Sequence, residues 1–307
     1  RFDRPLTPNG YAWWYVDALS DDGRHALTLI AMLGSVFSPF YAKARRGAGP
    51  VDPLGHCSMN VALYGPGSSA WALTERGARA VTRGRDELAI GPSHMRWEGG
   101  SFVIDFDERS APLGARVAGT VRIHPEEMGG ETVQLDAAGR HRWTPIAPLA
   151  RAEVELRHPS LRWRGTAYLD SNGGDRPLEQ DFSRWDWSRV ASKKGARVTY
   201  DVDRRDGSRL LFARAFEQGG RAHDLPDVAR IAGERTLWGL DRKLHASPGE
   251  RPALLETLED TPFYARSLVR VDRQGPSAIG TQETLCLDRF QRPWVQFLLP
   301  YRMRREP

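Results

Sequence analysis

Four residues in the middle of the sequence carry side chains that are suited to acid–base chemistry. Tyr168 and Asp170 stand two apart in the short run 165–170, and His141 and Trp143 repeat that spacing upstream. Residues two apart in an extended strand point to the same face. A carboxylic acid, a phenol, an imidazole and an indole could therefore line one cavity. This set suits proton transfer to an apolar substrate that becomes cationic in the transition state, because aromatic rings attract cations through their faces.

Asp170 is the carboxylic acid of this group. A carboxylic acid can act as a proton donor only if it is protonated at the working pH, and burial among Tyr and Trp raises the pKa of an Asp in that direction. A structural role is the alternative. Residues 171–174, Ser-Asn-Gly-Gly, predict that the strand ends at Asp170, and an Asp at such a point often forms a turn. His141 could likewise be a packed or surface residue beside a tryptophan.

Three other carboxylates compete with Asp170. Asp186 lies between two tryptophans but in a strand would face away from both, so we interpret it as a surface or hydrogen-bonded residue. Asp17 follows an aromatic run and could line a cavity, although we favour a strand-end position before a turn. Glu75 is interpreted as part of a local ion pair or turn.

Metal and cofactor motifs are missing from the sequence. His56-Cys57 is the one close His/Cys pair, and no H-x-x-x-H or C-x-x-C spacing occurs. The sequence also lacks a G-x-S-x-G elbow, a phosphate loop and a dinucleotide fingerprint. We therefore expect a reaction that uses neither a metal nor a cofactor.

Composition and charge indicate an ordinary globular chain. Its 307 residues suggest two domains, 40% are hydrophobic and 27% are charged, and the formal net charge is +5. The ten tryptophans should line cores or a ligand cavity. Basic residues do not alternate with stacking aromatics in a stripe, so nucleic acid is not an expected partner. Cys57 and Cys286 lie far apart in the sequence, which favours free or buried thiols in a reducing cytoplasm over a disulfide framework.

The most apolar stretch, residues 26–41, is too short and too interrupted by Gly, Ser and Pro to form a membrane-spanning helix. No signal peptide is visible, although the sequence begins at Arg1 rather than Met. A mildly basic surface is compatible with docking on anionic lipid headgroups. A substrate that is dissolved in a membrane would therefore be met at the membrane surface.

Turn signals between short apolar runs predict β structure throughout. Residues 11–18 and 25–33 flank a Ser-Asp-Asp-Gly turn, and residues 196–202 and 209–216 flank a second Asp-Gly turn, so both pairs predict hairpins. Further strands are predicted at 57–64, 71–74, 101–107, 116–124, 151–157, 265–271, 280–287 and 294–299. Helical periodicity is scarce, and residues 225–231 and 252–258 form short turns at best. These features predict an all-β protein of sandwich or barrel type with few short helices.

Three long runs of the sequence carry a family resemblance. They are residues 11–42, residues 56–77 and the run YLDSNGGDRPLEQDFSRWDWSR, which starts at Tyr168. They resemble the carotenoid 1,2-hydratases, also called hydroxyneurosporene synthases, of purple photosynthetic bacteria, and the resemblance covers nearly the whole chain. It implies two lipocalin-like β domains in tandem. We place them at residues 1–164 and 165–307, because the rhythm of polar turns restarts near Arg164.

The resemblance also implies roles for the four residues. In that family an Asp in a Y-x-D segment is the proposed proton donor, and an H-x-W segment is paired with it upstream. Asp170 would thus be the general acid, Trp143 and Tyr168 would stabilise a cation, and His141 would orient Asp170 or position the attacking water. The implied enzyme is a cofactor-independent hydro-lyase. It would add water to the terminal C1=C2 double bond of neurosporene or lycopene, through a tertiary carbocation, on the way to spheroidene- or spirilloxanthin-type pigments.

The expected partners are an acyclic carotenoid, a membrane surface and other enzymes of the carotenoid pathway. The protein would be cytoplasmic and peripherally associated with the intracytoplasmic membrane. The rival interpretation is a lipocalin-like carrier that binds an apolar ligand without chemistry, since a Trp-rich β-barrel would have the same composition. The position of Asp170 distinguishes the two. An enzyme needs it in apolar surroundings beside the other three residues, whereas in a carrier it could face solvent on a turn.

Overall fold

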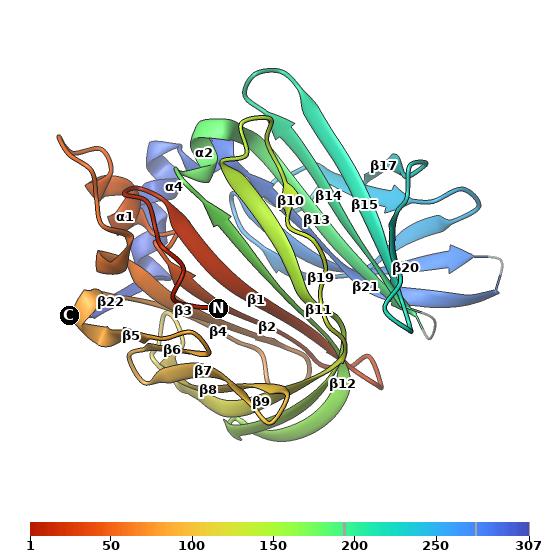
Figure 1. Cartoon of the computed structure of the whole chain (residues 1–307), viewed down its shortest axis with the longest axis horizontal. Helices are drawn as coiled ribbons and strands as arrows, with labels where there is room; N and C mark the ends of the chain where they lie inside the picture. Colours follow the sequence, from red (N-terminus) through yellow and green to blue (C-terminus); the bar gives the residue numbers. More distant parts are fainter. Residues whose placement is uncertain (193–194, 274, 307) are drawn as a thin grey trace. The chain divides into compact units, whose positions relative to one another are not determined.

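The computed structural model describes residues 1–192, 195–273 and 275–306, which form two compact units. Unit 1 comprises Arg1–Pro177 together with the C-terminal residues from Phe297, and unit 2 comprises Leu178–Gln296. Both units are built from mainly antiparallel sheets with short helices (Figure 1). The prediction of an all-β protein with few short helices is confirmed.

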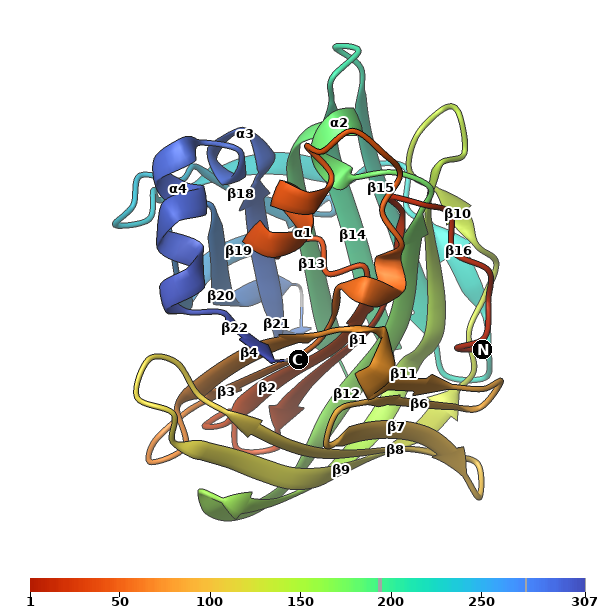
Figure 2. The same ribbon diagram turned by 90° about the vertical axis from the view of Figure 1, so that its left-hand side faces the viewer.

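Unit 1 holds one large sheet in which β12 and β11 are central. The strand order is β22-β4-β3-β2-β1-β12-β11-β9-β8-β7-β6-β5, and β10 pairs with β11. The sheet curls back on itself, so that β4 contacts β8 and β3 contacts β6 (Figure 2). Its strands are β1 (Tyr11–Ser20), β2 (Ala26–Leu33), β3 (Cys57–Tyr64), β4 (Ala70–Arg76), β5 (Val81–Arg83), β6 (Glu87–Ile90), β7 (Ser93–Glu98), β8 (Ser101–Arg109), β9 (Arg116–Glu127), β10 (Val133–Gln134), β11 (His141–His158), β12 (Ser160–Gly174) and β22 (Arg304–Glu306).

Strand alternation gives the sheet of unit 1 two different faces. One face forms the main hydrophobic core, to which β1 contributes Trp14 and Val16 and β12 contributes Ala167 and Leu169. The residues between them in sequence point to the opposite face. Tyr168, like the other residues of that face on β12, is therefore directed away from the core.

β12 is longer than the sequence predicts. The Ser-Asn-Gly-Gly cluster does not end the strand, because Gly173 and Gly174 continue the ladders with β1 and β11. A Cβ atom on Gly174 would lie 2.4 Å from the ring of Tyr11 and 2.7 Å from His141 Nδ1, so the glycine permits two neighbouring rings to approach the backbone. The predicted domain boundary near Arg164 falls inside this continuous strand, and the division into two lipocalin-like domains stays a prediction.

Unit 2 has a seven-stranded sheet in the order β16-β15-β14-β13-β21-β20-β19 and a separate hairpin of β17 and β18. The strands are β13 (Phe182–Ser192), β14 (Gly195–Arg204), β15 (Arg209–Glu217), β16 (Ala222–Asp224), β17 (Ala229–Gly233), β18 (Arg242–Ala246), β19 (Arg251–Asp260), β20 (Tyr264–Arg273) and β21 (Gly275–Cys286). Residues 252–258 therefore lie within a strand, not a turn. Residues 225–231 do contain a turn, at 226–227, but the last three residues of the range open β17.

The helices are short. They are α1 (Pro39–Ala44), α2 (Leu178–Asp181), α3 (Leu287–Phe290), α4 (Pro293–Leu298) and the 3₁₀ turns η1 (Pro53–Gly55), η2 (Ala78–Ala80) and η3 (Leu299–Tyr301). The predicted strand at 294–299 is wrong. Its alternating apolar residues lie on α4, which starts at Pro293, a residue that suits a first helical turn. Within the part of the chain that the structure describes, no helix is long and apolar enough to span a bilayer.

A buried ion pair joins two strands where the sheet of unit 1 closes. Arg76 on β4 donates two hydrogen bonds, of 3.0 and 2.9 Å, to the carboxylate of Glu108 on β8. Both side chains are almost inaccessible to solvent. Burial raises the pKa of Glu108, although the hydrogen bonds and charge of Arg76 and the hydroxyl of Ser93 oppose that change.

Replacing Arg76 with Met should lower the free energy of unfolding by about 3–5 kcal/mol, because it leaves a buried carboxylate without its partner. The loss should be larger at about pH 8 than at about pH 5. The pKa of Glu108 is raised in the folded state, so above the unfolded-state pKa of this group a rise in pH favours the unfolded chain, in which the carboxylate is hydrated. Urea unfolding at both pH values measures this. Arg116→Met is the control, because the pair of Arg116 with Asp107 is solvent-exposed and should contribute little. Equal losses in the two variants would contradict the prediction.

Candidate active site

Three of the four predicted residues form one hydrogen-bonded group in unit 1. The indole Nε1 of Trp143 donates to Asp170 Oδ2 at 2.8 Å and lies 3.1 Å from the hydroxyl oxygen of Tyr168. The Tyr168 hydroxyl donates to the same Asp170 oxygen at 2.7 Å. Trp143 and Tyr168 are fully buried and Asp170 is 2% exposed. The i, i+2 spacing of Tyr168 and Asp170 thus places them side by side, as predicted.

The pairing of β11 with β12 brings Trp143 to this group. The strands are antiparallel, with Trp143 opposite Asn172 and Pro145 opposite Asp170. Register shifts follow Pro145 and Ala147. Such irregularities bend a strand and change where its side chains point. The indole can therefore reach diagonally along the sheet to a carboxyl group that is not its direct cross-strand neighbour.

Two hydrogen-bond donors meet at one oxygen of the Asp170 carboxyl group. An indole N–H is a donor only, so Oδ2 must accept the hydrogen bond from Trp143. The same oxygen accepts the hydrogen bond of Tyr168. With Tyr168 as a donor to Oδ2, a proton on this carboxyl group would be carried by Oδ1. The arrangement can hold an aspartic acid in one orientation among aromatic rings, which is what a general acid needs.

His141, the fourth predicted residue, is fully buried at the start of β11. Its Nδ1 lies 2.9 Å from the hydroxyl oxygen of Tyr11, and the two rings stack with centroids 5.8 Å apart. The backbone N–H of His141 donates to Asp136 Oδ1 at 2.7 Å. Tyr11 and His141 both pair with Gly174 of β12, one from each side. These contacts hold the imidazole in a defined orientation.

Tyr11 is a site residue that the sequence interpretation missed. Its ring also stacks on Trp13 of the same strand, with centroids 4.9 Å apart. The spacing of Tyr11, Trp13 and Tyr15 on β1 repeats the i, i+2 pattern that marked the other four residues. Tyr15 lies opposite Asp170 and meets Tyr168 edge-on, with centroids 6.3 Å apart. An aromatic strand thus flanks the carboxyl group on the side away from β11.

Asp17 is not at a strand end. It lies within β1, is 1% exposed, and is paired with Tyr168 of β12 and Thr28 of β2. Because directly opposite residues share a face of a sheet, Asp17 lies on the same face as Tyr168 and Asp170. Asp17 is therefore a further buried carboxyl group on the face that carries Asp170.

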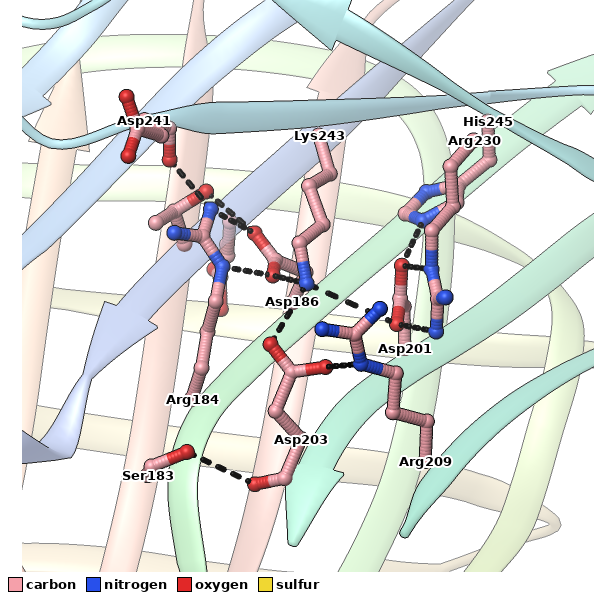
Figure 3. Close-up of polar contacts among 12 residues, drawn as sticks. Ser183, Arg184, Asp186, Asp201, Asp203, Arg209, Arg230, Asp241, Lys243 and His245 are labelled. Atoms are coloured by element: carbon pink, nitrogen blue, oxygen red, sulfur yellow. Dashed lines mark hydrogen bonds and ion pairs between the residues drawn. The ribbon is translucent and has the colours of Figure 1, made fainter. Parts of the chain in front are cut away.

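Asp186, in unit 2, belongs to a network of charged residues (Figure 3). Arg184 Nε donates to its Oδ2 at 2.6 Å, Thr284 Oγ1 donates to its Oδ1 at 2.7 Å, and Lys243 Nζ lies 3.7 Å away. It lies on the strand face opposite its two neighbouring tryptophans, as expected of a hydrogen-bonded residue. These contacts give Asp186 a structural role within unit 2.

The same network surrounds Asp201 on β14. Arg230 of β17 forms an ion pair with it, and His245 Nε2 of β18 lies 3.1 Å from its Oδ2 (Figure 3). Burial raises the pKa of Asp201, but the hydrogen bonds from His245 and Arg230 and the charge of Lys243 outweigh burial and hold the pKa well below its usual range. The contacts of Arg230 and His245 with Asp201 therefore connect the β17–β18 hairpin to the sheet of unit 2.

Glu75 also lies in an ion pair, but not in a local one. It is fully buried, and its Oε1 lies 2.9 Å from His56 Nδ1 and 2.8 Å from Arg305 Nη1. Arg305 belongs to β22, which adds to β4 in parallel. The contact holds the C-terminal strand on the sheet of unit 1.

Among the described residues, no cluster of three or more His, Cys, Asp or Glu side chains has the arrangement of a metal site. Both cysteines are free thiols, Cys57 buried and Cys286 partly buried, in agreement with the sequence. Burial raises the pKa of Cys57 to about 12, so its thiol stays protonated and is a poor nucleophile.

Comparison with known proteins gives concordant results. A family model described as carotenoid hydratase CrtC matches residues 29–307. An acyclic carotenoid 1,2-hydratase from Thiocapsa roseopersicina is 49% identical over 306 residues, which is 99% of this chain and 75% of that protein. The protein of the same name from Cereibacter sphaeroides is 39% identical over 91% of this chain and 98% of its own length.

A crystal structure of an AttH-type protein from Nitrosomonas europaea has a TM-score of 0.65 at 14% identity, covering 90% of this chain and 92% of that one. This likeness concerns the fold alone. The family model, in contrast, spans nearly the whole sequence, and the sequence identities extend over the strands that hold the site. The chain therefore belongs to the CrtC family of carotenoid hydratases.

Proposed function

We propose that this protein is an acyclic carotenoid 1,2-hydratase, which adds water to the terminal C1=C2 double bond of neurosporene or lycopene without a cofactor. One observation carries the proposal for the site. Asp170 is buried and is held by Trp143 and Tyr168 on one face of the sheet, instead of facing solvent on a turn. This position favours the enzyme over the carrier. The hydratase names of the two relatives support the reaction and the substrate class.

In the proposed reaction Asp170 is the general acid. The proton on Oδ1 passes to C2, the less substituted alkene carbon, and the π electrons form the new C–H bond. This leaves a tertiary cation at C1 and a carboxylate on Asp170. The faces of Trp143 and Tyr168 stabilise the cation. The Trp143 and Tyr168 donors also hold the new carboxylate, because hydrogen bonds to a charged acceptor are stronger than those to a neutral one.

Water completes the proposed reaction by attacking C1. The oxygen lone pair forms the C–O bond, and the resulting oxonium loses a proton to the Asp170 carboxylate, which restores the acid. The net change is the addition of one water molecule to the alkene. His141, whose ring is fixed by Tyr11, is the residue that we assign to position this water. The site thus needs a rigid imidazole, which stacking and the contact with Tyr11 provide.

The partners follow from the substrate. An acyclic carotenoid is a long hydrocarbon that dissolves in the core of a bilayer, so the protein should work at a membrane surface on the cytoplasmic side. Enzymes that deliver and consume such hydrocarbons would act on the same surface. Vesicle binding of the purified protein, measured by flotation, tests this part of the proposal separately from the chemistry.

Purified protein incubated with lycopene in detergent or liposomes, without added cofactor, should yield a product heavier by one water. In D2O the product should gain one non-exchangeable deuterium at C2, because the acid equilibrates its proton with solvent before each turnover. In water enriched in oxygen-18, the tertiary hydroxyl should carry the label. Chromatography with mass spectrometry measures all three. Tight binding of lycopene without any product would instead identify a carrier.

A further inference from the structure

The helix α4, whose place in the fold can be seen in Figure 2, carries large apolar side chains that are exposed to solvent. Trp294, Phe297, Leu298 and Tyr301 follow the i, i+3, i+4, i+7 spacing of one helix face, continued from α4 into η3. Their exposed fractions are 46%, 66%, 41% and 65%, whereas Val295 points inward and is 1% exposed. A surface helix of a globular protein ordinarily exposes charged residues and buries its apolar stripe. Together, α4 and η3 bury one residue and expose four large apolar ones.

In unit 2, an exposed loop lies against Trp294 of α4. Trp238 stacks on Trp294 with centroids 6.2 Å apart and is 47% exposed, while its neighbour Leu237 is 99% exposed. The loop backbone is fixed, because the Leu237 N–H donates to Asp260 Oδ2 at 2.7 Å and Arg289 Nη1 donates to the Trp238 carbonyl at 2.5 Å. We call the four residues Trp294, Phe297, Leu298 and Tyr301, which follow one another along the continuous segment of α4 and η3, the aromatic face.

Arginine residues flank the aromatic face on both sides in the sequence. Residues 291–303 contain two arginines and no acidic residue. Arg292 directly precedes α4, Arg302 directly follows Tyr301, and both are exposed. Trp and Tyr are the residue types that prefer the boundary between lipid headgroups and acyl chains, and arginine is attracted to anionic headgroups. Phe297 and Leu298 stand between them in the sequence, where a surface helix would enter the acyl region.

We propose that the aromatic face docks this protein on the surface of an anionic lipid bilayer, with Phe297 and Leu298 inserted among the acyl chains and the flanking arginines at the headgroups. The choice of a bilayer rests on the charge complementarity described above. It also rests on the proposed function, since the substrate of a carotenoid hydratase is dissolved in such a bilayer. The docking site is thus a defined part of the chain, separate from the residues that we assign to catalysis.

Vesicle flotation tests the proposal directly. Wild-type protein should float with vesicles of equal parts phosphatidylglycerol and phosphatidylcholine, and less with phosphatidylcholine alone. The double variant Phe297→Glu/Leu298→Glu should lose about tenfold or more of its vesicle binding. Leu113→Glu and Leu255→Glu are matched controls, because these leucines are 93% and 46% exposed and lie outside the aromatic face. The proposal is supported if the two control variants float with the vesicles as the wild type does and the double variant does not. Flotation of the double variant at the wild-type level would overturn it.

A second measurement does not depend on charged substitutions. Lipids brominated in the upper acyl chain should quench the tryptophan fluorescence of the wild type, and the variant Trp238→Phe/Trp294→Phe should lose most of that quenching while still binding vesicles. Quenching that is unchanged in this variant would show that other tryptophans meet the lipid. Sedimentation velocity without lipid adds a further check, since a wild-type dimer that dissociates on Phe297→Glu would identify a second copy of the chain as the occupant.

Two activity assays separate this proposal from that of the function. With lycopene dispersed in detergent, Phe297→Glu/Leu298→Glu should keep hydration within about twofold of the wild type, because no lipid surface has to be bound. With lycopene in vesicles, its rate should fall in parallel with vesicle binding. If the wild type shows no hydration at all but binds vesicles through this face, the docking proposal stands and the proposed function fails.

Discussion

Replacing Asp170 with Asn should lower the rate constant for hydration of lycopene by about 10²–10⁴-fold, the usual contribution of a general acid. An amide has no acidic proton to give to C2. It keeps the size of the carboxyl group, and its oxygen can still accept the hydrogen bonds that Trp143 and Tyr168 donate to Oδ2. The loss should therefore appear in kcat, while the affinity for lycopene, measured by quenching of protein fluorescence, stays near that of the wild type.

Asp17→Asn is the matched control for this result. Asp17 is another buried carboxyl group on the same sheet face, opposite Tyr168 on the neighbouring strand. If Asp170 is the acid, Asp17→Asn should keep much more activity than Asp170→Asn. The reverse order would move the proton donor to Asp17. Far-ultraviolet circular dichroism of both variants would exclude unfolding as the cause of either loss.

The sequence predicted the local arrangement of the site because the relevant elements are strands. A period of two fixes which side chains share a face, so Tyr168 and Asp170 could be paired without knowledge of the fold. The run from Cys57 to Tyr64 was bounded correctly for a similar reason, since turn residues flank it on both sides. Prediction worked where the determining residues are neighbours in the sequence.

Contacts between distant segments could not be predicted in this way. Tyr11 and His141 are 130 residues apart, and they meet only because β1 and β11 both pair with β12. The strand order, which no spacing reveals, decides this contact. The same holds for Glu75 and Arg305, whose ion pair depends on the addition of β22 to β4. The one resemblance to a known family supplied what spacing alone could not, namely the reaction.

Two errors have a common physical origin. The prediction of a strand at 294–299 took an apolar run as evidence of β structure, although its residues also fit the helical spacing that α4 adopts. The predicted end of β12 took Gly173 and Gly174 as turn residues, although they are strand residues that make room for Tyr11 and His141. In both cases a local pattern had two structural interpretations, and packing with distant residues decided between them.

Trp143→Phe and Tyr168→Phe should each lower kcat by about 5–30-fold, because each removes one hydrogen bond to the carboxyl group, worth about 1–2 kcal/mol. Both keep an aromatic face for the cation. The double variant should lose less than the product of the two factors. The two donors share a single acceptor atom and also lie 3.1 Å from each other, so removal of one already disturbs the other. A double-mutant cycle on kcat, with lycopene in detergent, measures this coupling.

Trp97→Phe combined with Trp143→Phe is the control cycle. Trp97 lies on β7, three strands away from β11 in the sheet, and packs against the core on the other face. Its effect should add to that of Trp143→Phe within about 0.5 kcal/mol, as expected of independent positions. If the effects of Trp143→Phe and Tyr168→Phe on kcat were also additive, the two side chains would not act through the same oxygen, Oδ2 of Asp170. Clear coupling in that pair alone would show that the indole and the phenol act on catalysis through one oxygen of Asp170, which leaves the other oxygen to carry the proton.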